Sequence, residues 1–168
     1  MKRSCETLKP TKNLFNTIVT LLNSKRVDFR VIDHPPIDGS ASGSSEVTGT
    51  RPEQGAKSLV MMASELPIMV VVRGPDRVDF KAVKEATSSK NVRMATLAEV
   101  EQTTNSDVGT LPPIGSLFNI QTYFDQTLID EGEIAFGTGS RTSTIVMRAD
   151  KLVRVFKPIV GKFSRKKK

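Results

Sequence analysis

The sequence predicts an α/β fold in which a mixed, barrel-like central β-sheet is surrounded by helices. Apolar residues at helical spacing alternate along the chain with short apolar runs that are typical of strands. Two of these runs, Lys57 to Met62 and Pro67 to Arg73, are separated by a short polar connection that suits a hairpin. Hairpins interleaved with helices indicate one domain built around a mixed sheet.

The chain of 168 residues has the length of one ordinary domain. We expect a flexible N-terminal segment over 1–10, a single domain over 11–157 and a basic tail or linker over 158–168. The longest apolar run, Ile68 to Val72, is far shorter than the roughly 20 residues that cross a bilayer, and no secretory signal is visible. The single cysteine, Cys5, offers neither an internal disulfide nor a zinc spacing. These features favour a cytoplasmic protein that does not enter a membrane.

Two regions before the hairpin have contrasting patterns. Leu14, Ile18 and Leu22 fall at helical spacing and predict an amphipathic helix over 11–26, which a short strand follows from Phe29. The segment 38–45 consists of small and polar residues with Ala41 as its one apolar residue. We therefore expect an exposed flexible loop there, with a lid over a site as the alternative.

The elements after the hairpin follow from local signals. Helical spacing predicts a helix over 79–87, and Thr96 with Glu99 forms a capping-box pattern that starts another. The paired prolines and flanking glycines of Gly109 to Gly115 exclude a helix interior and a central strand. Further apolar runs then lead to a short helix over 149–156.

The positive charge is concentrated at the C-terminal end. Of the 25 basic residues, eight lie between Lys151 and Lys168, where there is no acidic residue, and the other 17 nearly balance the 18 acidic residues. A basic stretch such as Phe163 to Lys168 attracts polyanions without reading sequence. A solubilising end or a linker to a further domain are the alternatives.

No common catalytic constellation is present. His34 is the single histidine, so any Ser-His-Asp set would have to include it, and no Gly-x-Ser-x-Gly nucleophile elbow occurs. Neither a phosphate-binding loop nor a histidine-rich metal spacing occurs. We therefore expect no metal and no cofactor. An enzyme with this sequence would work through backbone groups and substrate positioning.

Three features can nevertheless carry chemistry. Lys57 opens an apolar strand, where it could hold a phosphate or a carboxyl group or simply be a surface lysine. The loop Gly109 to Gly115 could turn backbone N–H groups toward a ligand carbonyl. Gly137 and Gly139 lack a Cβ and could let a ligand approach the backbone, or they form a turn between two strands.

In this order the motifs resemble the YbaK family, also called the prolyl-tRNA synthetase-associated or inserted editing domain. The resemblance covers about 29–155. The motifs that carry it are His34-Pro35, Lys57-Ser-Leu-Val60, Gly74 to Asp79, Gly109-x-x-x-Pro113-x-Gly115, Asp125-x-x-Leu128, Gly137-x-Gly139-Ser140 and the closing pair Asp150 and Leu152.

The resemblance implies a metal-independent aminoacyl-tRNA deacylase that proofreads translation by hydrolysing the ester of mischarged tRNA. Alanine on proline tRNA is the first expected substrate, with cysteine or serine next. The tRNA is the implied partner, together with prolyl-tRNA synthetase or a multi-synthetase complex. The run Ser140-Arg-Thr-Ser-Thr144 stands where some inserted domains carry a histidine, which leaves the amino-acid preference open.

By position, the resemblance makes Lys57 the essential lysine near the terminal adenosine and Gly109 the start of the catalytic carbonyl-binding loop. It implies that the substrate-binding residues are His34, Thr110, Leu111, Pro112, Pro113, Gly115, Asp125, Gly137, Gly139 and Ser140. We expect tRNA to contact Lys57 and the basic residues Lys162, Arg165, Lys166, Lys167 and Lys168.

Two other functions compete with this expectation. A catalytically inactive tRNA-binding or scaffold module would bind tRNA with steep salt dependence and would not hydrolyse it. A nucleotide-binding α/β protein would use Gly137 to Ser140 as a phosphate turn, but no helix pattern begins directly after that turn.

Overall fold

The computed structural model of the chain describes residues 10–38 and 41–168. The expected flexible segment over 1–10 therefore lies almost entirely outside the described residues. The helices of the described part are α1 Pro10–Ser24, α2 Ala41–Thr48, α3 Phe80–Thr87, α4 Leu97–Thr104, α5 Gln126–Asp130 and α6 Ala149–Phe156, with the 3-10 turns η1 Pro52–Gln54 and η2 Gly115–Phe118.

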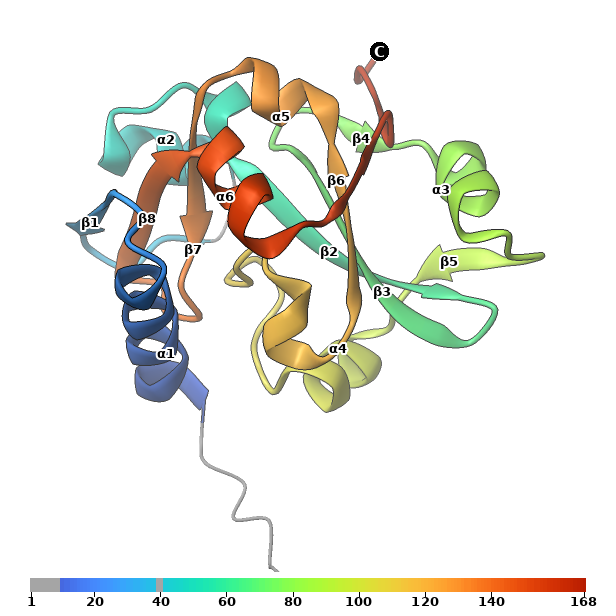
Figure 1. Cartoon of the computed structure of the whole chain (residues 1–168), viewed down its shortest axis with the longest axis horizontal. Helices are drawn as coiled ribbons and strands as arrows, with labels where there is room; N and C mark the ends of the chain where they lie inside the picture. Colours follow the sequence, from blue (N-terminus) through green and yellow to red (C-terminus); the bar gives the residue numbers. More distant parts are fainter. Residues whose placement is uncertain (1–9, 39–40) are drawn as a thin grey trace, which may run out of the picture.

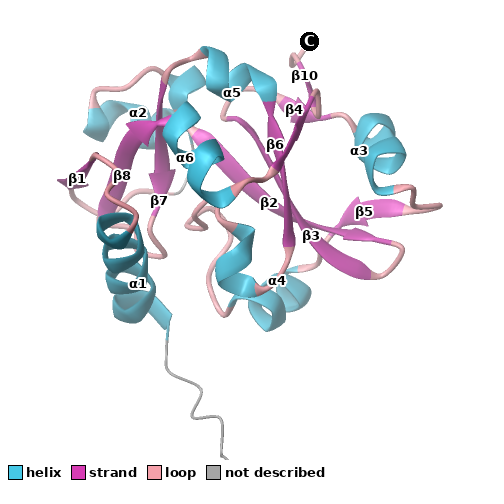
Figure 2. Ribbon diagram, in the orientation of Figure 1, coloured by secondary structure: helices cyan, strands magenta, loops and turns pink. Residues whose placement is uncertain are grey.

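The strands form three sheets (Figure 2). The strand bounds are β1 Phe29–Asp33, β2 Ala56–Ala63, β3 Leu66–Arg73, β4 Arg77–Val78, β5 Val92–Met94, β6 Gln121–Asp125, β7 Glu133–Gly137, β8 Ser143–Arg148, β9 Ile159–Gly161 and β10 Ser164–Arg165. The five-stranded sheet has the order β5-β2-β3-β6-β9 and is mixed, because β6 runs parallel to β3 and to β9. The three-stranded sheet β1-β8-β7 is antiparallel, and β10 pairs with β4.

The predicted mixed α/β fold is confirmed, but the sheets do not close into a barrel. Figure 1 shows the three-stranded and five-stranded sheets side by side, with α6 lying over the junction between them. An isolated parallel bridge between Gly55 and Ala135 joins the start of β2 to β7. This contact brings the N-terminal end of β2 against the β7–β8 hairpin, where the candidate site lies.

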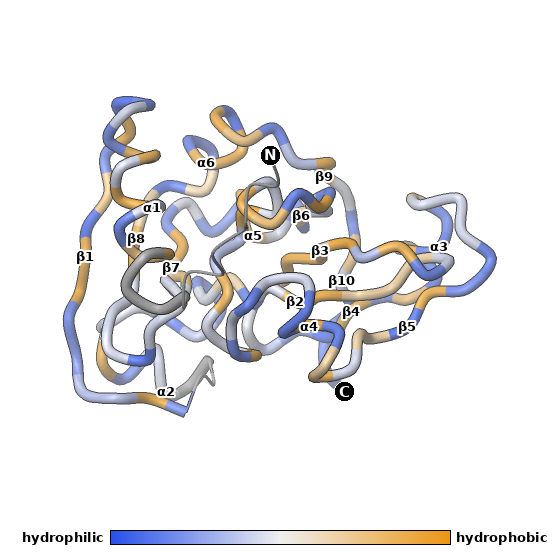
Figure 3. The backbone as a smooth tube through the Cα atoms, turned by 90° about the horizontal axis from the view of Figure 1, so that it is seen from below, coloured by the Kyte–Doolittle hydropathy of each residue, from blue (hydrophilic) through white to orange (hydrophobic). Residues whose placement is uncertain are grey.

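The predicted β2–β3 hairpin is present, with Ala63 opposite Leu66. Its two turn residues, Ser64 and Glu65, have φ angles of 47° and 66°. Positive φ at both central residues is the geometry of a type I′ turn, whose twist matches that of paired strands. The hydrophobic stretches along the β2–β3 pair are visible in Figure 3.

Both faces of the five-stranded sheet are covered. On one face, Val71 and Phe124 pack in a core cluster with Ile18 and Leu22 of α1 and Leu152 of α6. The opposite face contributes a second cluster, in which Val70, Val72 and Tyr123 pack with Val83 of α3 and with Phe163. Burial on both faces explains why β3 is an almost unbroken apolar run.

The prediction of a flexible loop over 38–45 is wrong for residues 41–45, because these belong to α2, which begins at Ala41. Ser and Gly are poor helix formers, but propensity is overridden when tertiary contacts support the backbone. Here α2 packs against η1, and Ser44 lines the main cavity.

The segment expected to be a tail from residue 158 is folded onto the domain as far as Arg165. Strand β9 extends the five-stranded sheet beside β6, and β10 pairs with β4. Phe163, between them, is only 4% exposed. The prediction of a tail relied on the basic residues and overlooked the one aromatic side chain that anchors the segment.

Candidate functional site

One cavity of about 380 Å³ brings together most of the segments that the sequence singled out. Its walls come from the start of β2, the loop before Leu111, the β7–β8 hairpin and α2. Of the predicted site residues, those that line the cavity are Lys57, Gly109, Thr110, Leu111, Gly137 and Ser140. Segments far apart in the sequence therefore meet around one concave site.

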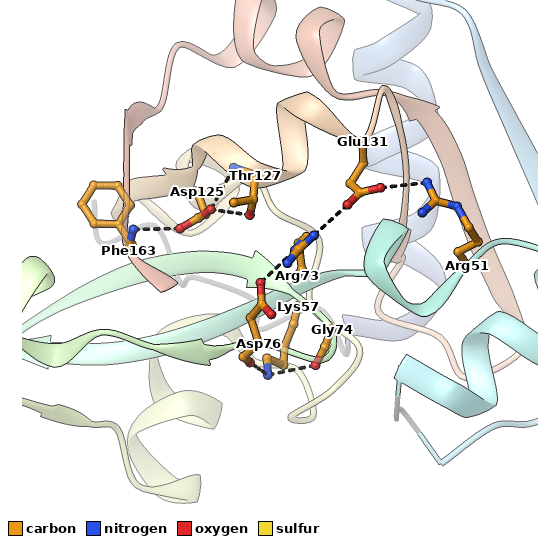
Figure 4. Close-up of polar contacts among 9 residues, drawn as sticks. All are labelled: Arg51, Lys57, Arg73, Gly74, Asp76, Asp125, Thr127, Glu131 and Phe163. Atoms are coloured by element: carbon orange, nitrogen blue, oxygen red, sulfur yellow. Dashed lines mark hydrogen bonds and ion pairs between the residues drawn. The ribbon is translucent and has the colours of Figure 1, made fainter. Parts of the chain in front are cut away.

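Lys57 is half-buried at the start of β2, and its ammonium group is held by two backbone carbonyls. Nζ donates hydrogen bonds to Asp76 O at 2.6 Å and to Gly74 O at 3.1 Å (Figure 4). An ammonium group has three N–H donors, so one remains for a ligand in the cavity. Burial lowers the pKa of Lys57, as do the positive charges of Arg77 and Lys167, while the Asp76 carboxylate opposes the shift.

The turn that holds Lys57 is fixed by an ion-pair network. Arg73 Nε donates to Asp76 Oδ2 at 2.7 Å and Arg73 Nη1 donates to Glu131 Oε1 at 2.8 Å. Arg51 Nη2 donates to the second oxygen of Glu131, also at 2.8 Å (Figure 4). The network ties the end of β3 to η1 and to the end of α5, and no local sequence pattern indicated it.

The loop at Gly109 meets the β7–β8 hairpin through the backbone. Gly109 has a φ of +88°, which favours glycine. Thr110 O accepts a hydrogen bond of 2.7 Å from Gly139 N, and a Cβ on Gly137 would lie 2.6 Å from that carbonyl oxygen. Gly137 is therefore required by the close approach of the loop, and it is the last residue of β7, where it lies opposite Thr144 of β8.

Two amides of this loop are candidate hydrogen-bond donors for a ligand. Gly109 and Leu111 line the cavity, and within the described part of the chain neither backbone N–H has a hydrogen-bond partner. Thr110, between them, donates to Asp107 O through its backbone N–H and its hydroxyl. Thr110 thus holds the loop in place, and the amides of Gly109 and Leu111 on either side of Thr110 remain as donors.

Ser58 is a site residue that the sequence analysis missed. It lines the cavity and is 8% exposed, and its hydroxyl has no hydrogen-bond partner among the described residues. A buried hydroxyl without a partner costs stability. The available signal was a polar residue inside the otherwise apolar run after Lys57. Further lining residues that were missed are Ile37, Ser44, Val108, Arg141, Ser143 and Thr144.

His34 does not line the cavity but supports its wall. Its Nδ1 lies 2.8 Å from Pro35 O and its Nε2 lies 2.9 Å from the hydroxyl of Thr144, which does line the cavity. Because a carbonyl only accepts, Nδ1 donates to Pro35 O, and Nε2 pairs with the Thr144 hydroxyl. The imidazole therefore orients a lining residue.

Four other predicted residues lie behind or beside the cavity. Gly139 packs against Leu14 of α1 and has a φ of +84°. Pro112 and Pro113 are buried, and the Gly115 amide donates to the Thr122 hydroxyl at 2.8 Å. Their geometry supports the loop and does not place them at the cavity surface.

Asp125 is also away from the cavity and is 1% exposed. One carboxylate oxygen accepts from the backbone amide and the hydroxyl of Thr127, so that Asp125 caps α5. The other oxygen accepts from Phe163 N at 2.7 Å (Figure 4). These contacts make Asp125 a structural link between β6, α5 and the C-terminal segment.

The basic residues of the C-terminal segment are exposed. Lys162 precedes the buried Phe163, while Arg165 lies opposite Arg77 in the β10–β4 pair. Lys166, Lys167 and Lys168 follow directly.

The described residues contain neither a metal-binding cluster nor a membrane-spanning helix. No group of three or more His, Cys, Asp or Glu residues in 10–38 and 41–168 is arranged to hold a metal ion. Within the same ranges, no helix combines the length and the apolar character needed to span a membrane.

Comparisons with known proteins agree with this geometry. The family model for the aminoacyl-tRNA editing domain matches residues 34–155. A hypothetical protein, APE2540, superimposes with a TM-score of 0.82 at 21% identity, covering 88% of this chain and 99% of the other. A proposed trans-editing enzyme for prolyl tRNA synthetase superimposes with a TM-score of 0.79 at 20% identity, covering 95% and 99%. No curated protein sequence matches the chain.

Proposed function

Because this chain belongs to the aminoacyl-tRNA editing domain family, we propose that it is a deacylase that hydrolyses the ester of mischarged tRNA without a metal ion. The observation that carries the proposal is the meeting of the Lys57 ammonium group and the Gly109–Leu111 loop in one cavity. A cationic anchor beside unpaired backbone amides suits a substrate with a phosphate near an ester carbonyl.

In the proposed reaction the loop amides hold the ester carbonyl, and Lys57 uses its remaining N–H to anchor the terminal adenosine or its phosphate. Water attacks the carbonyl carbon, the negative charge develops on the carbonyl oxygen near the loop, and the bond to the ribose oxygen then breaks. The ribose oxygen takes the proton that the attacking water has given up, and the free amino acid leaves. With no histidine at the cavity surface in the described part of the chain, the neighbouring ribose hydroxyl of the tRNA orients the water.

The proposed substrate is alanine on proline tRNA, with cysteine or serine as the next candidates. The structural similarity to a proposed trans-editing enzyme for prolyl tRNA synthetase supports proline tRNA as the carrier. One methylene is worth only about 1–3 kcal/mol of binding in an apolar pocket, so a site that must spare the correct proline does better by excluding its larger ring sterically.

The test is deacylation of alanyl-, cysteinyl-, seryl- and prolyl-tRNA-Pro by the native chain, by Lys57→Ala and by a control, Lys25→Ala, at an exposed position that does not line the cavity. We expect one mischarged species to be hydrolysed, prolyl-tRNA to be spared, and the activity to be lost in Lys57→Ala alone. Binding of tRNA with no hydrolysis of any species would contradict the proposal and favour an inactive scaffold module of a synthetase or multi-synthetase assembly.

A further inference from the structure

Five exposed basic residues lie on the β10–β4 pair and in the three residues that follow it, and they are here called the basic strip. Its members are Arg77, Arg165, Lys166, Lys167 and Lys168. Arg165 of β10 lies directly opposite Arg77 of β4. Like charges in directly opposed strand positions repel each other, so this pairing costs stability unless an anion lies between or beside them.

The backbone of the basic strip is fixed to the domain. Phe163 N donates to Asp125 and Phe163 O accepts from Asp79 N, both at 2.7 Å. The Phe163 ring packs edge-on against Tyr123 at a centroid distance of 5.6 Å. Figure 1 shows the C-terminal segment running past β6 to β4 before it ends. Residues as far as Arg165 therefore hold a fixed position that a free tail would lack.

The basic strip begins at the cavity. Arg77 directly follows Asp76, whose carbonyl holds Lys57. Arg77 and Lys167 are close enough to Lys57 to lower its pKa, after the larger effect of burial. The Asp76 carboxylate opposes this effect on Lys57, but it is 5% exposed and already paired with Arg73, so it does not neutralise the exposed residues of the basic strip.

We propose that the basic strip binds the sugar–phosphate backbone of the RNA strand that leads into the cavity, so that Lys57, Arg77, Arg165 and the following lysines contact successive phosphates. This inference rests on the proposed function, because it assumes that the cavity receives the 3′ end of a tRNA. Contacts of this kind position the strand and carry no base specificity.

Two variants with equal net charge test the proposal. The strip variant is Lys166→Gln, Lys167→Gln, Lys168→Gln, and the control is Lys25→Gln, Lys90→Gln, Arg154→Gln, all at exposed positions. Each is assayed for kcat and KM on mischarged tRNA over a series of salt concentrations. A second substrate, 2′(3′)-O-alanyl-adenosine, has the ester but no phosphate.

We expect the strip variant alone to show a roughly tenfold higher KM on tRNA. In a plot of log KM on tRNA against log salt concentration, the slope for the strip variant should be smaller by about 0.7 for each phosphate that it no longer binds. Its activity on alanyl-adenosine, which has no phosphate for the basic strip to bind, should fall much less than its activity on tRNA. Equal increases of KM in both variants, or an unchanged salt dependence, would overturn the proposal.

If the native chain hydrolyses neither substrate, the proposed function fails on its own. Binding of uncharged tRNA, measured with the same variants and salt series, then still decides whether the basic strip contacts RNA. Weaker binding of the strip variant alone supports the strip, and equal binding of both variants rejects it.

Discussion

At the scale of single residues, two serines on the wall of the same cavity differ in one respect. Ser58 and Ser143 are 8% and 7% exposed, and both line the cavity. The Ser143 hydroxyl is hydrogen-bonded to that of Thr138 at 2.7 Å, whereas the Ser58 hydroxyl has no partner in the described part of the chain. A polar atom kept buried and unpaired is expected where a ligand will pair with it.

We therefore predict opposite effects of the same substitution at the two positions. Ser58→Ala removes an unpaired hydroxyl and should raise the free energy of unfolding by about 1 kcal/mol while lowering deacylation, since the substrate loses a hydrogen bond. Ser143→Ala leaves the Thr138 hydroxyl with only its longer hydrogen bond of 3.3 Å to the carbonyl of residue 143 and should lower the free energy of unfolding by about 1 kcal/mol. Urea unfolding and deacylation rates check both. A destabilised Ser58→Ala with normal activity would be the contrary result.

The residues that sequence reasoning found are those whose chemistry stands out locally. Lys57 is a charge opening an apolar strand, and Gly109 and Gly137 stand at conspicuous glycine positions, so all three were placed at the site and line the cavity. Asp125 carried an equally visible motif, but its role depends on Phe163, which lies 38 residues further along the chain. Local patterns show which residue is special and do not show what it contacts.

At the scale of elements, the Arg73–Glu131 pair joins three segments that share no sheet pairing. Arg73 ends β3, Glu131 follows α5, and Arg51 precedes η1. Burial disfavours the charged form of Glu131, but the hydrogen bonds from Arg73 and Arg51 outweigh it and lower its pKa below the usual value. Because Arg73 also holds Asp76, the network supports the turn that positions Lys57.

We predict that Glu131→Gln destabilises the protein in a pH-dependent manner. A carboxyl group whose pKa is lowered by folding contributes stability above its unfolded-state pKa, and this is lost as the pH falls through the folded-state pKa. The variant should be less stable by about 2 kcal/mol at pH 7, and the difference from the native chain should shrink below about pH 4.5. Thermal unfolding from pH 7 to 3 measures this.

Glu101→Gln, at an exposed position of α4, is the control for that measurement. It should leave the stability within about 0.5 kcal/mol of the native value at every pH. A constant difference between Glu131→Gln and the native chain across the whole range would show that the side chain acts through packing and not through its charge.

Elements defined by local signals were predicted well, and elements defined by contacts were not. The capping box of Thr96 and Glu99 is present at the start of α4, and the β2–β3 hairpin has the predicted strands. Helix α2 was missed because its serine-rich sequence has no helical signal of its own and the helix depends on its neighbours. Strands β9 and β10 were missed because two or three residues cannot show a period.

At the scale of the whole molecule, the C-terminal segment completes the domain. It supplies the outer strand of the five-stranded sheet and the Phe163 ring of the second core cluster. It also supplies the amide that pairs with the buried Asp125 carboxylate. The folded unit therefore extends beyond the boundary at residue 157 that the charge pattern predicted, and the basic residues are carried on structure as far as Arg165.

We predict that two truncations separate folding from charge. A chain ending at Arg165 lacks three lysines but no buried side chain, so its urea midpoint should match that of the full chain. A chain ending at Lys157 lacks the buried Phe163 ring and leaves Asp125 without one of its donors, and its free energy of unfolding should fall by about 4 kcal/mol. Urea unfolding followed by circular dichroism measures both.

A milder substitution covers the case in which the shorter chain does not fold. Phe163→Leu in the full chain keeps the backbone hydrogen bonds and most of the apolar volume, so it should cost about 1 kcal/mol. Because the ring holds the strand that bears Arg165 in place, hydrogen exchange should become faster at residues 159–165 before it changes in β7 or β8. Equal midpoints for the two truncated chains, together with unchanged exchange in Phe163→Leu, would mean that the segment is a tail after all and contributes nothing to the domain.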